Sequence, residues 1–297
     1  MYDGIINVYK EKGFTSHDVV AKLRGILRMK KIGHTGTLDP DAEGVLPVCV
    51  GKATKLCEFL LEKSKTYRAV MVLGITTDTQ DISGEVIEKR DVNVSKDEIV
   101  NTINSFIGGY DQVPPMYSAL KVNGKKLYEY ARAGIEVERK PRFVKLDNIE
   151  SLDISEDLLK VTIDVACSKG TYIRTLCHDI GQKLGCGACM ESLLRTKVEQ
   201  YMLEDALKLN EIEELVKQNA MEEHITTVED ILACYPKVTI KKAAEKLLLN
   251  GNKFNINSVV PSDKREDVRV YDTEDRFVAL YAYDEKYREY KPLKMFL

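Results

Sequence analysis

The sequence predicts an α+β fold with a mixed sheet, followed by a smaller β-rich unit at the C-terminal end. Helical and strand patterns both occur, but they do not alternate in the regular βαβ rhythm of a doubly wound sheet. The 297 residues are enough for one large domain with a small companion. A composition of 44% hydrophobic and 31% charged residues is typical of a globular protein.

The first half of the chain begins its helices at recognisable caps. Residues 15–27 open with a Thr-Ser-His-Asp capping box and continue with apolar residues at helical spacing. Residues 95–107 repeat this pattern from a Ser-Lys-Asp-Glu box to a Gly-Gly stop. Between them, residues 53–63 have helical spacing, and residues 68–74 form a mostly apolar strand that we expect to be buried.

The second half combines a strand, a helix and a distinct tail. Residues 159–167 alternate apolar and polar side chains, as a half-buried strand does, and residues 173–184 have helical spacing that ends at a glycine. The acidic helical sequence that follows gives way to a short helix pattern and a hairpin over residues 268–283. We therefore predict a main domain at 1–235 and a small β-rich domain at 236–297.

The composition excludes membrane and secreted classes of protein. No apolar run approaches the roughly 20 residues that a membrane span needs. The first ten residues lack the basic start and the long apolar core of a signal peptide. Because the seven cysteines have no disulfide-framework spacing, we expect reduced thiols and a cytoplasmic protein that contacts no membrane.

Local charge points to a polyanionic partner, although the net charge of −3 does not. Residues 21–37 carry five basic side chains and no acid, and residues 116–142 carry seven basic side chains against three glutamates, interleaved with tyrosines. Basic segments with aromatic residues on a mildly acidic protein are typical of nucleic-acid contacts. A solvated charged face explains the same pattern equally well.

The segment 33–48, GHTGTLDPDAEGVLPV, is too broken for a helix, and its apolar end predicts a strand that re-enters the core. Asp39 precedes a proline, which pushes its backbone toward extended geometry, so the loop can present one carboxylate rigidly. In the alternative interpretation Asp39 only caps its own backbone in an Asx-turn, and the motif alone favours that. Asp41 and Glu43 have the character of solvated loop acids.

Arg174 is a cation in the first turn of its predicted helix, where the helix dipole disfavours positive charge. This position suggests an anionic partner, either a phosphate or a carboxylate. An exposed arginine without a partner is the alternative, at a cost of a few tenths of a kcal/mol.

Two further motifs carry little weight. The segment Gly51-Lys-Ala-Thr lacks the earlier glycine and the Ser or Thr after lysine that a phosphate-binding P-loop requires. Cys186 and Cys189 have CxxC spacing, which suggests a thiol or zinc protein. There is no second such pair, and this one follows a helix instead of opening one, so buried structural thiols are the favoured interpretation.

Several long motifs follow one another along residues 1–235: GHTGTLDP at 33–40, GVLP at 44–47, GKATK at 51–55, KTYR at 65–68, VPPMYSALK at 113–121, GKKLYEYAR at 124–132 and CSKGTYIR at 167–174. Together they resemble the TruB family of tRNA pseudouridine synthases. The tail at 236–297 is similar to the small PUA-type RNA-binding barrel of this family. Cys189 departs from the pattern, since a histidine often stands there.

The resemblance implies a pseudouridine synthase fold, with a mixed, largely antiparallel sheet flanked by helices. It implies isomerisation of uridine to pseudouridine at position 55, in the T-loop of tRNA. The glycosidic bond is broken and remade at carbon 5, so no cofactor or metal is needed. The partner would be the T-arm stem-loop, without a guide RNA or an obligate protein partner, since RNA-guided relatives are longer at both ends. The alternative is a non-catalytic RNA-binding or RNA-folding protein on the same fold.

The resemblance also assigns the catalytic residues. Asp39 matches the nucleophile, which attacks either the ribose C1′ or the uracil ring. Arg174 matches the partner that keeps this carboxylate ionised in a desolvated pocket, and removing either would strand a buried charge at roughly 3–5 kcal/mol. Tyr67 matches an active-site aromatic residue that offsets the unstacking of the flipped base. The presence of all three residues argues against loss of the chemistry.

The remaining matches are substrate contacts. His34 matches a residue that fills the space left by the flipped nucleotide, Tyr172 a ring that supports the ion pair, and Leu193 an apolar wall for the base, with Leu194 one register away. Lys55 and Lys169 are expected phosphate contacts. Residues 116–142 match an inserted arm that closes over RNA.

Overall fold

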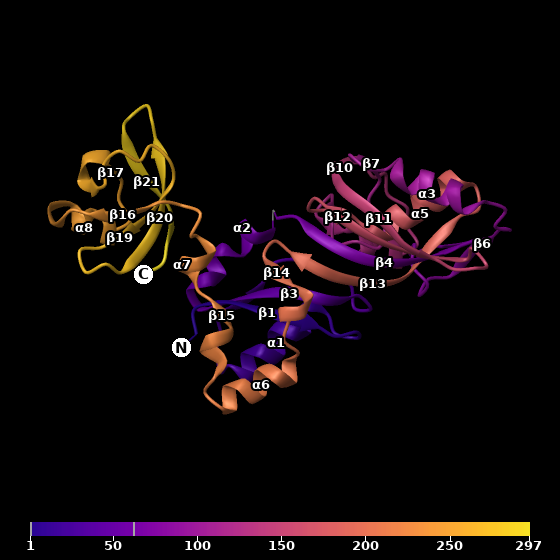
Figure 1. Ribbon diagram of the computed structural model, residues 1–297, viewed down its shortest axis with the longest axis horizontal. Helices are drawn as coiled ribbons and strands as arrows, with labels where there is room; N and C mark the ends of the chain where they lie inside the picture. Colours follow the sequence, from indigo (N-terminus) through magenta and orange to yellow (C-terminus); the bar gives the residue numbers. More distant parts are fainter. Residues whose placement is uncertain (1, 62) are drawn as a thin grey trace.

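A nine-stranded sheet and a six-stranded sheet organise the part of the chain that the computed structural model describes, residues 2–61 and 63–297 (Figure 1). The larger sheet has the order β11-β12-β4-β13-β3-β1-β15, with β14 beside β13 and β2 beside β3. Its strands are β1 Gly4–Lys10, β2 Ile32–His34, β3 Glu43–Val50, β4 Lys65–Leu73, β11 Leu146–Ile154, β12 Lys160–Cys167, β13 Ala188–Val198, β14 Tyr201–Met202 and β15 Ile225–Thr226.

The larger sheet is mixed but largely antiparallel, which confirms the predicted fold class. The described exception is the short parallel contact between β13 and β3, where Leu194 lies opposite Glu43 and Arg195 opposite Gly44. Gly44 has a φ of +103°, and a Cβ there would lie 2.2 Å from the backbone oxygen of Arg195. The junction therefore requires glycine, and it lies directly after the Asp39 loop.

Helices cover the sheet in two groups (Figure 1). Helix α1, Ser16–Ile26, begins at the predicted capping box on Thr15 and packs with α6, Leu209–Lys217, over β1 and β3. Helices α3, Lys96–Asn104, and α5, Ile173–Leu184, pack over β4, β11 and β12. Both capping boxes and the glycine stop after α5, in left-handed geometry, are confirmed.

Two expectations change in detail. The helical segment expected at 53–63 is a 3₁₀ turn, η1 Gly51–Leu56, followed by the short helix α2 Cys57–Leu61. Leu159, expected on the buried face of its strand, is 42% exposed. The strand begins only at Lys160, because the chain turns at Leu158 with a φ of +60°.

The basic segment 116–142 forms an excursion from the main body. Strands β7 Tyr110–Gln112 and β10 Arg142–Val144 pair on either side of it. Within it lie the hairpin of β8 Lys121–Val122 and β9 Lys125–Lys126 and the helix α4 Leu127–Arg132. Another hairpin, β5 Ile75–Thr77 with β6 Val86–Lys89, precedes it.

The six-stranded sheet lies at the far end of the molecule, beyond α7 Val228–Ile231 (Figure 1). Its order is β17-β21-β20-β19-β16-β18, and the predicted hairpin of β19 and β20 is confirmed. These strands are β16 Lys237–Ile240, β17 Phe254–Asn255, β18 Val259–Val260, β19 Val268–Tyr271, β20 Phe277–Asp284 and β21 Glu289–Met295, with α8 Glu245–Leu249 beside them. Leu280 and Phe296 share an apolar cluster with Ile5 and Leu56, which joins the two sheets.

The short connecting turns are η2 Leu203–Asp205, η3 Met221–His224, η4 Lys242–Ala244 and η5 Ile256–Ser258. Among the described helices, each is too short or too polar to span a lipid bilayer.

Candidate active site

The loop that carries Asp39 connects β2 to β3 and is tethered at its start and directly before Asp39. The Thr35 N–H donates to Pro47 O at 3.1 Å, and the Leu38 N–H donates to the Ser16 hydroxyl at 2.9 Å. These bonds satisfy backbone groups that an irregular loop would otherwise leave unpaired. The rigidity expected from the Asp-Pro step is thus supplied largely by the surrounding structure.

Lys10 is a third tether, and it is not among the residues selected from the sequence. It is fully buried at the end of β1, and its ammonium donates to Pro40 O at 3.0 Å and Ala42 O at 2.6 Å. Burial lowers the pKa of Lys10 to about 8, although nearby carboxylates oppose the shift. The one available signal was a lysine that ends an otherwise apolar strand.

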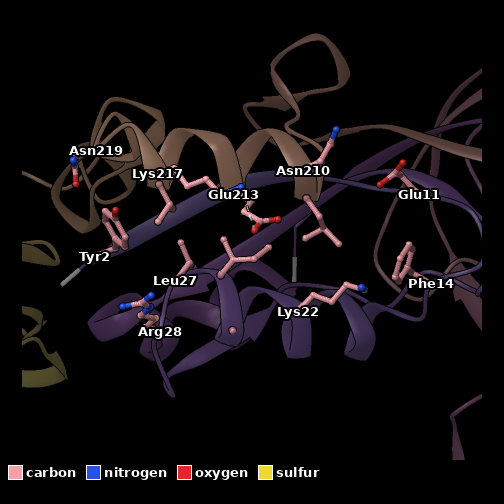
Figure 2. A pocket seen from close by; sticks show the side chains of 14 residues that line it. Tyr2, Glu11, Phe14, Lys22, Leu27, Arg28, Asn210, Glu213, Lys217 and Asn219 are labelled. Carbon is pink, nitrogen blue, oxygen red and sulfur yellow. Dashed lines mark ion pairs between the residues drawn. The ribbon is translucent and has the colours of Figure 1, made fainter.

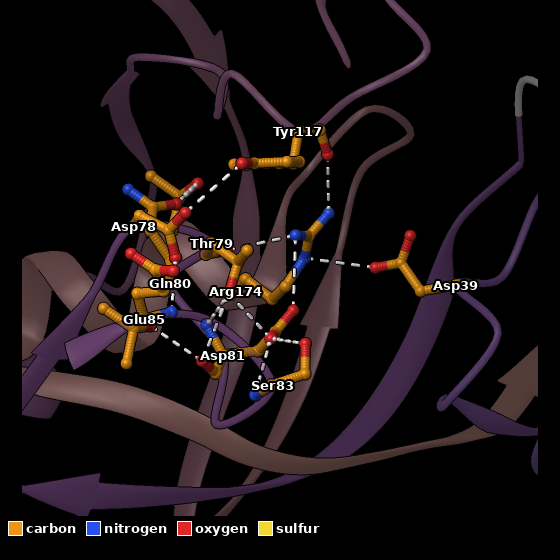
Figure 3. A network of polar contacts seen from close by, with 11 residues as sticks. Asp39, Asp78, Thr79, Gln80, Asp81, Ser83, Glu85, Tyr117 and Arg174 are labelled. Atoms are coloured by element: carbon orange, nitrogen blue, oxygen red, sulfur yellow. Dashed lines mark hydrogen bonds and ion pairs between the residues drawn. The ribbon is translucent and has the colours of Figure 1, made fainter. Parts of the chain in front are cut away.

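Arg174 lies in the first turn of α5, and its side chain is only 8% exposed. Its Nε is 3.1 Å from Asp39 Oδ2, which joins two residues 135 positions apart in the sequence (Figure 3). The carboxylate of Asp39 is 47% exposed, so a fixed guanidinium faces an accessible acid. The anionic partner expected from the helix dipole is therefore present, and it is a carboxylate.

The rest of the Arg174 guanidinium is held by the loop after β5 and by the basic segment (Figure 3). Nη1 donates to Thr79 O at 3.1 Å and lies 3.4 Å from Asp81 Oδ2, and Nη2 donates to Tyr117 O at 2.9 Å. Asp81 accepts from the Thr79 hydroxyl at 2.8 Å and from the Ser83 N–H at 3.0 Å. Sequence analysis missed Asp81, because its polar segment has the appearance of an ordinary turn.

A cavity of about 350 Å³ opens beside this ion pair. Its lining includes six of the predicted residues, namely Asp39, Tyr67, Lys169, Tyr172, Arg174 and Leu193. Its volume lies within the roughly 300–1,000 Å³ of small-ligand sites. Leu193 lines the cavity and Leu194 does not.

Tyr67 lies on β4 and is 8% exposed, so its ring forms part of the cavity wall. Burial raises the pKa of the Tyr67 hydroxyl, and the neighbouring Arg195 guanidinium opposes that shift. Tyr172 is the N-cap residue of α5 and is fixed by Gln112, whose side-chain oxygen accepts from the Tyr172 N–H at 2.8 Å.

Two predicted residues lie outside the cavity lining. His34 accepts from the Gly36 N–H at 3.4 Å and makes an edge contact with His17, and burial lowers the pKa of His34. Lys55 donates to Met295 O at 2.6 Å, at the contact between the two sheets. The structure therefore does not bring Lys55 to the ion pair.

A larger cavity, of about 910 Å³, lies between α1 and α6 (Figure 2). Tyr2, Phe14, Leu27, Lys22 and Glu213 are among its lining residues. It contains none of the predicted catalytic or substrate-binding residues, so size alone does not locate the reaction.

Cys186 and Cys189 are both buried. Burial raises the pKa of both thiols, which disfavours the thiolate that redox or metal chemistry requires.

Comparison with known proteins gives a consistent result. The profile of the TruB family pseudouridylate synthase N-terminal domain matches residues 24–173, and that of the tRNA pseudouridylate synthase B C-terminal domain matches residues 174–233. A protein named tRNA pseudouridine synthase B from Lachnoclostridium phytofermentans is 54% identical, over 99% of this chain and 100% of the relative. A protein of the same name from Staphylococcus aureus is 45% identical over the full length of both chains.

The fold has a solved counterpart as well. A chain in the crystal structure of a Cbf5–Nop10–Gar1 complex is 30% identical, with a TM-score of 0.73 over 99% of this chain and 85% of that one. Matches of this identity and coverage establish descent from a common family. The chain belongs to the TruB family of pseudouridylate synthases.

Proposed function

We propose that this protein isomerises one uridine of tRNA to pseudouridine, at position 55 in the T-loop. The observation that carries the proposal is the accessible Asp39 carboxylate held 3.1 Å from the buried Arg174 guanidinium at the wall of a nucleotide-sized cavity. The name shared by the relatives, tRNA pseudouridine synthase B, supports tRNA as the substrate.

The reaction breaks the C1′–N1 glycosidic bond and forms a C1′–C5 bond, and the proton that leaves C5 is balanced by one that N1 gains. Asp39 is the nucleophile, and it must be ionised to act. Arg174 lies where it stabilises that negative charge without reorganising during the reaction, since three further contacts hold its guanidinium.

The cavity is suited to a base that has left its stack. Tyr67 offers an aromatic face and Leu193 an apolar wall, which together offset the free energy of unstacking. Tyr172 braces the ion pair from the N-terminus of α5, and His34 fills the space vacated by the flipped nucleotide. Lys169, on the cavity rim, contacts RNA phosphate.

The remaining parts position the RNA. Residues 116–142 close over the T-arm, and residues 117–120 already form part of the cavity wall. The small domain at 236–297 is a PUA-like RNA-binding unit attached to a catalytic domain at 1–235, and Lys55 adds a phosphate contact at the contact between the two sheets. The enzyme works on tRNA in the cytoplasm without a guide RNA or an obligate protein partner.

The test uses an unmodified tRNA transcript tritiated at uracil C5. We expect tritium release with the wild type and with Asp41→Asn, which changes an exposed acid of the same loop, and none with Asp39→Asn. Replacing uridine by cytidine at position 55 should abolish release. A folded wild type that binds tRNA without releasing tritium would instead be a non-catalytic RNA-binding protein.

A further inference from the structure

Two buried cations that the proposed mechanism does not use lie together on the cavity wall. Lys65, on β4, is 8% exposed, and Arg195, on β13, is 1% exposed. Both line the cavity that contains Asp39. Gly36 lies against both of them, since a Cβ at this glycine would be 3.4 Å from Arg195 Nη1 and 3.5 Å from Lys65 Cε.

The partners of both cations are neutral. The Lys65 ammonium donates to Leu61 O at 3.2 Å and to Lys63 O at 2.6 Å. The Arg195 guanidinium donates to Val45 O at 2.6 Å and to Gly36 O at 3.3 Å. Within residues 2–61 and 63–297, no carboxylate lies within ion-pair distance of either cation.

Two buried cations without a counter-charge raise the free energy of the folded protein. Buried charges in proteins are normally paired, because desolvation is costly without a counter-charge. Burial, followed by the proximity of Arg195, lowers the pKa of Lys65 to about 8. The described acid on the cavity wall, Asp39, is already engaged by Arg174. The wall therefore has a positive face that an incoming anion would complete.

We propose that Lys65 and Arg195 form an anion subsite that takes a phosphate flanking the flipped uridine. This assignment rests on the proposed function for the identity of the ligand. Lys65 and Tyr67 are two residues apart on one face of β4, about 7 Å along the strand. A nucleotide whose base lies on the Tyr67 ring thus brings its own phosphate toward Lys65, and the contact favours the flipped state over the stacked one.

The test combines a neutral side chain with a neutral phosphate. Lys65→Met removes the charge and keeps the shape, and Lys63→Met is the matched control, since the Lys63 ammonium lies 4.8 Å from the Phe59 ring centroid and does not line the cavity. The RNA is a T-arm stem-loop with a methylphosphonate at the phosphate 5′ or 3′ of the target uridine. The dissociation constant and the tritium release rate are measured separately.

We expect one of the two neutral linkages to weaken binding to the wild type and to Lys63→Met by roughly tenfold. Lys65→Met should bind the unmodified RNA roughly tenfold more weakly, with no further loss on the neutral linkage. Its affinity should also depend less on salt, with a slope smaller by about 0.7 for one phosphate contact. The variant should melt close to the wild type, because relief of the Arg195 repulsion offsets the lost donor to the two carbonyls, whereas Lys10 has carboxylates nearby that favour its charge.

Two outcomes would overturn the subsite. One is an equal effect of each neutral linkage on wild type and Lys65→Met. The other is a lower melting temperature for Lys65→Met with the same loss on all RNAs, which would make Lys65 a structural tie to the carbonyls of residues 61 and 63. Binding is measured apart from turnover. If the neutral linkage weakens binding only when Lys65 is present, but no tritium is released, the proposed function is rejected and the anion subsite is retained.

Discussion

Replacing Arg174 by methionine should lower the rate far more than the affinity for tRNA. The substitution removes the donor of four contacts, to Asp39, Asp81, Thr79 O and Tyr117 O. It leaves the substrate cavity lined by the same apolar and aromatic groups. In the proposed mechanism the ion pair acts on the reacting carboxylate, whereas phosphate contacts elsewhere are expected to supply most of the binding free energy of tRNA.

The expected magnitudes follow from the exposure of each partner. Asp39 is half-exposed, so water replaces its lost contact, and the loss lowers the unfolding free energy by less than about 1 kcal/mol. Asp81 and the two carbonyls each lose roughly 1 kcal/mol, which gives a loss of about 3 kcal/mol in unfolding free energy. Loss of a preorganised charge at the reacting group should lower kcat by about 10²–10³-fold.

Single-turnover tritium release, filter binding and thermal melting measure the three quantities. Arg174→Lys is the second variant. It keeps the charge, but a single ammonium lacks the planar guanidinium fork and cannot bond all four partners. It should melt closer to the wild type and still lose at least about tenfold in rate. A kcat within threefold of the wild type for Arg174→Met would refute the ion-pair role, as would equal losses in affinity and rate.

Three further predictions concern the loop and its supports. Lys10→Met should lower the unfolding free energy by about 1–3 kcal/mol in urea titrations, because Pro40 O and Ala42 O lose their donor. It should also lower the reaction rate without weakening tRNA binding. Unchanged stability would contradict this prediction. The pKa of Lys10 is about 8 in the folded protein and ordinarily 10.5, so the unfolded chain binds more protons between these pH values. The stability of the wild type relative to Lys10→Met should therefore rise from pH 8 to 10. A fall in this stability difference would mean that the pKa of Lys10 is raised on folding. Gly44→Ala should lower the unfolding free energy by more than about 2 kcal/mol, since its Cβ would lie 2.2 Å from Arg195 O. If this variant melted at the same temperature as the wild type, the close approach would be disproved.

Local signals in the sequence predicted the elements well. The capping boxes at residues 15 and 95 marked the starts of α1 and α3, because they depend on side chains within one turn of the chain. The hairpin of β19 and β20 followed from alternation around a polar turn. The segment 53–63 was harder, since a 3₁₀ turn and an α-helix share their spacing of apolar residues over so short a stretch.

Apart from the residues that the family resemblance supplied, the site was predictable only where a residue conflicted with its local setting. Arg174, at the positive end of a helix dipole, signalled an anionic partner before that partner was known. Asp81 and Arg195 gave no such signal and Lys10 only a weak one, because their roles depend on tertiary placement among backbone carbonyls and a neighbouring cation. Lys55 has the right chemistry for a phosphate contact, but the 3₁₀ turn that carries it lies at the contact with the C-terminal sheet, away from the ion pair.

We infer that Asp39 converts one particular uridine of tRNA. Carbodiimide adduct mapping by primer extension locates pseudouridine in an incubated transcript. We predict a single new stop, adjacent to position 55, with the wild type and Asp41→Asn, and no stop with Asp39→Asn. A stop produced by Asp39→Asn would rule out Asp39 as the nucleophile, and a wild-type stop at any other uridine would rule out position 55 as the target.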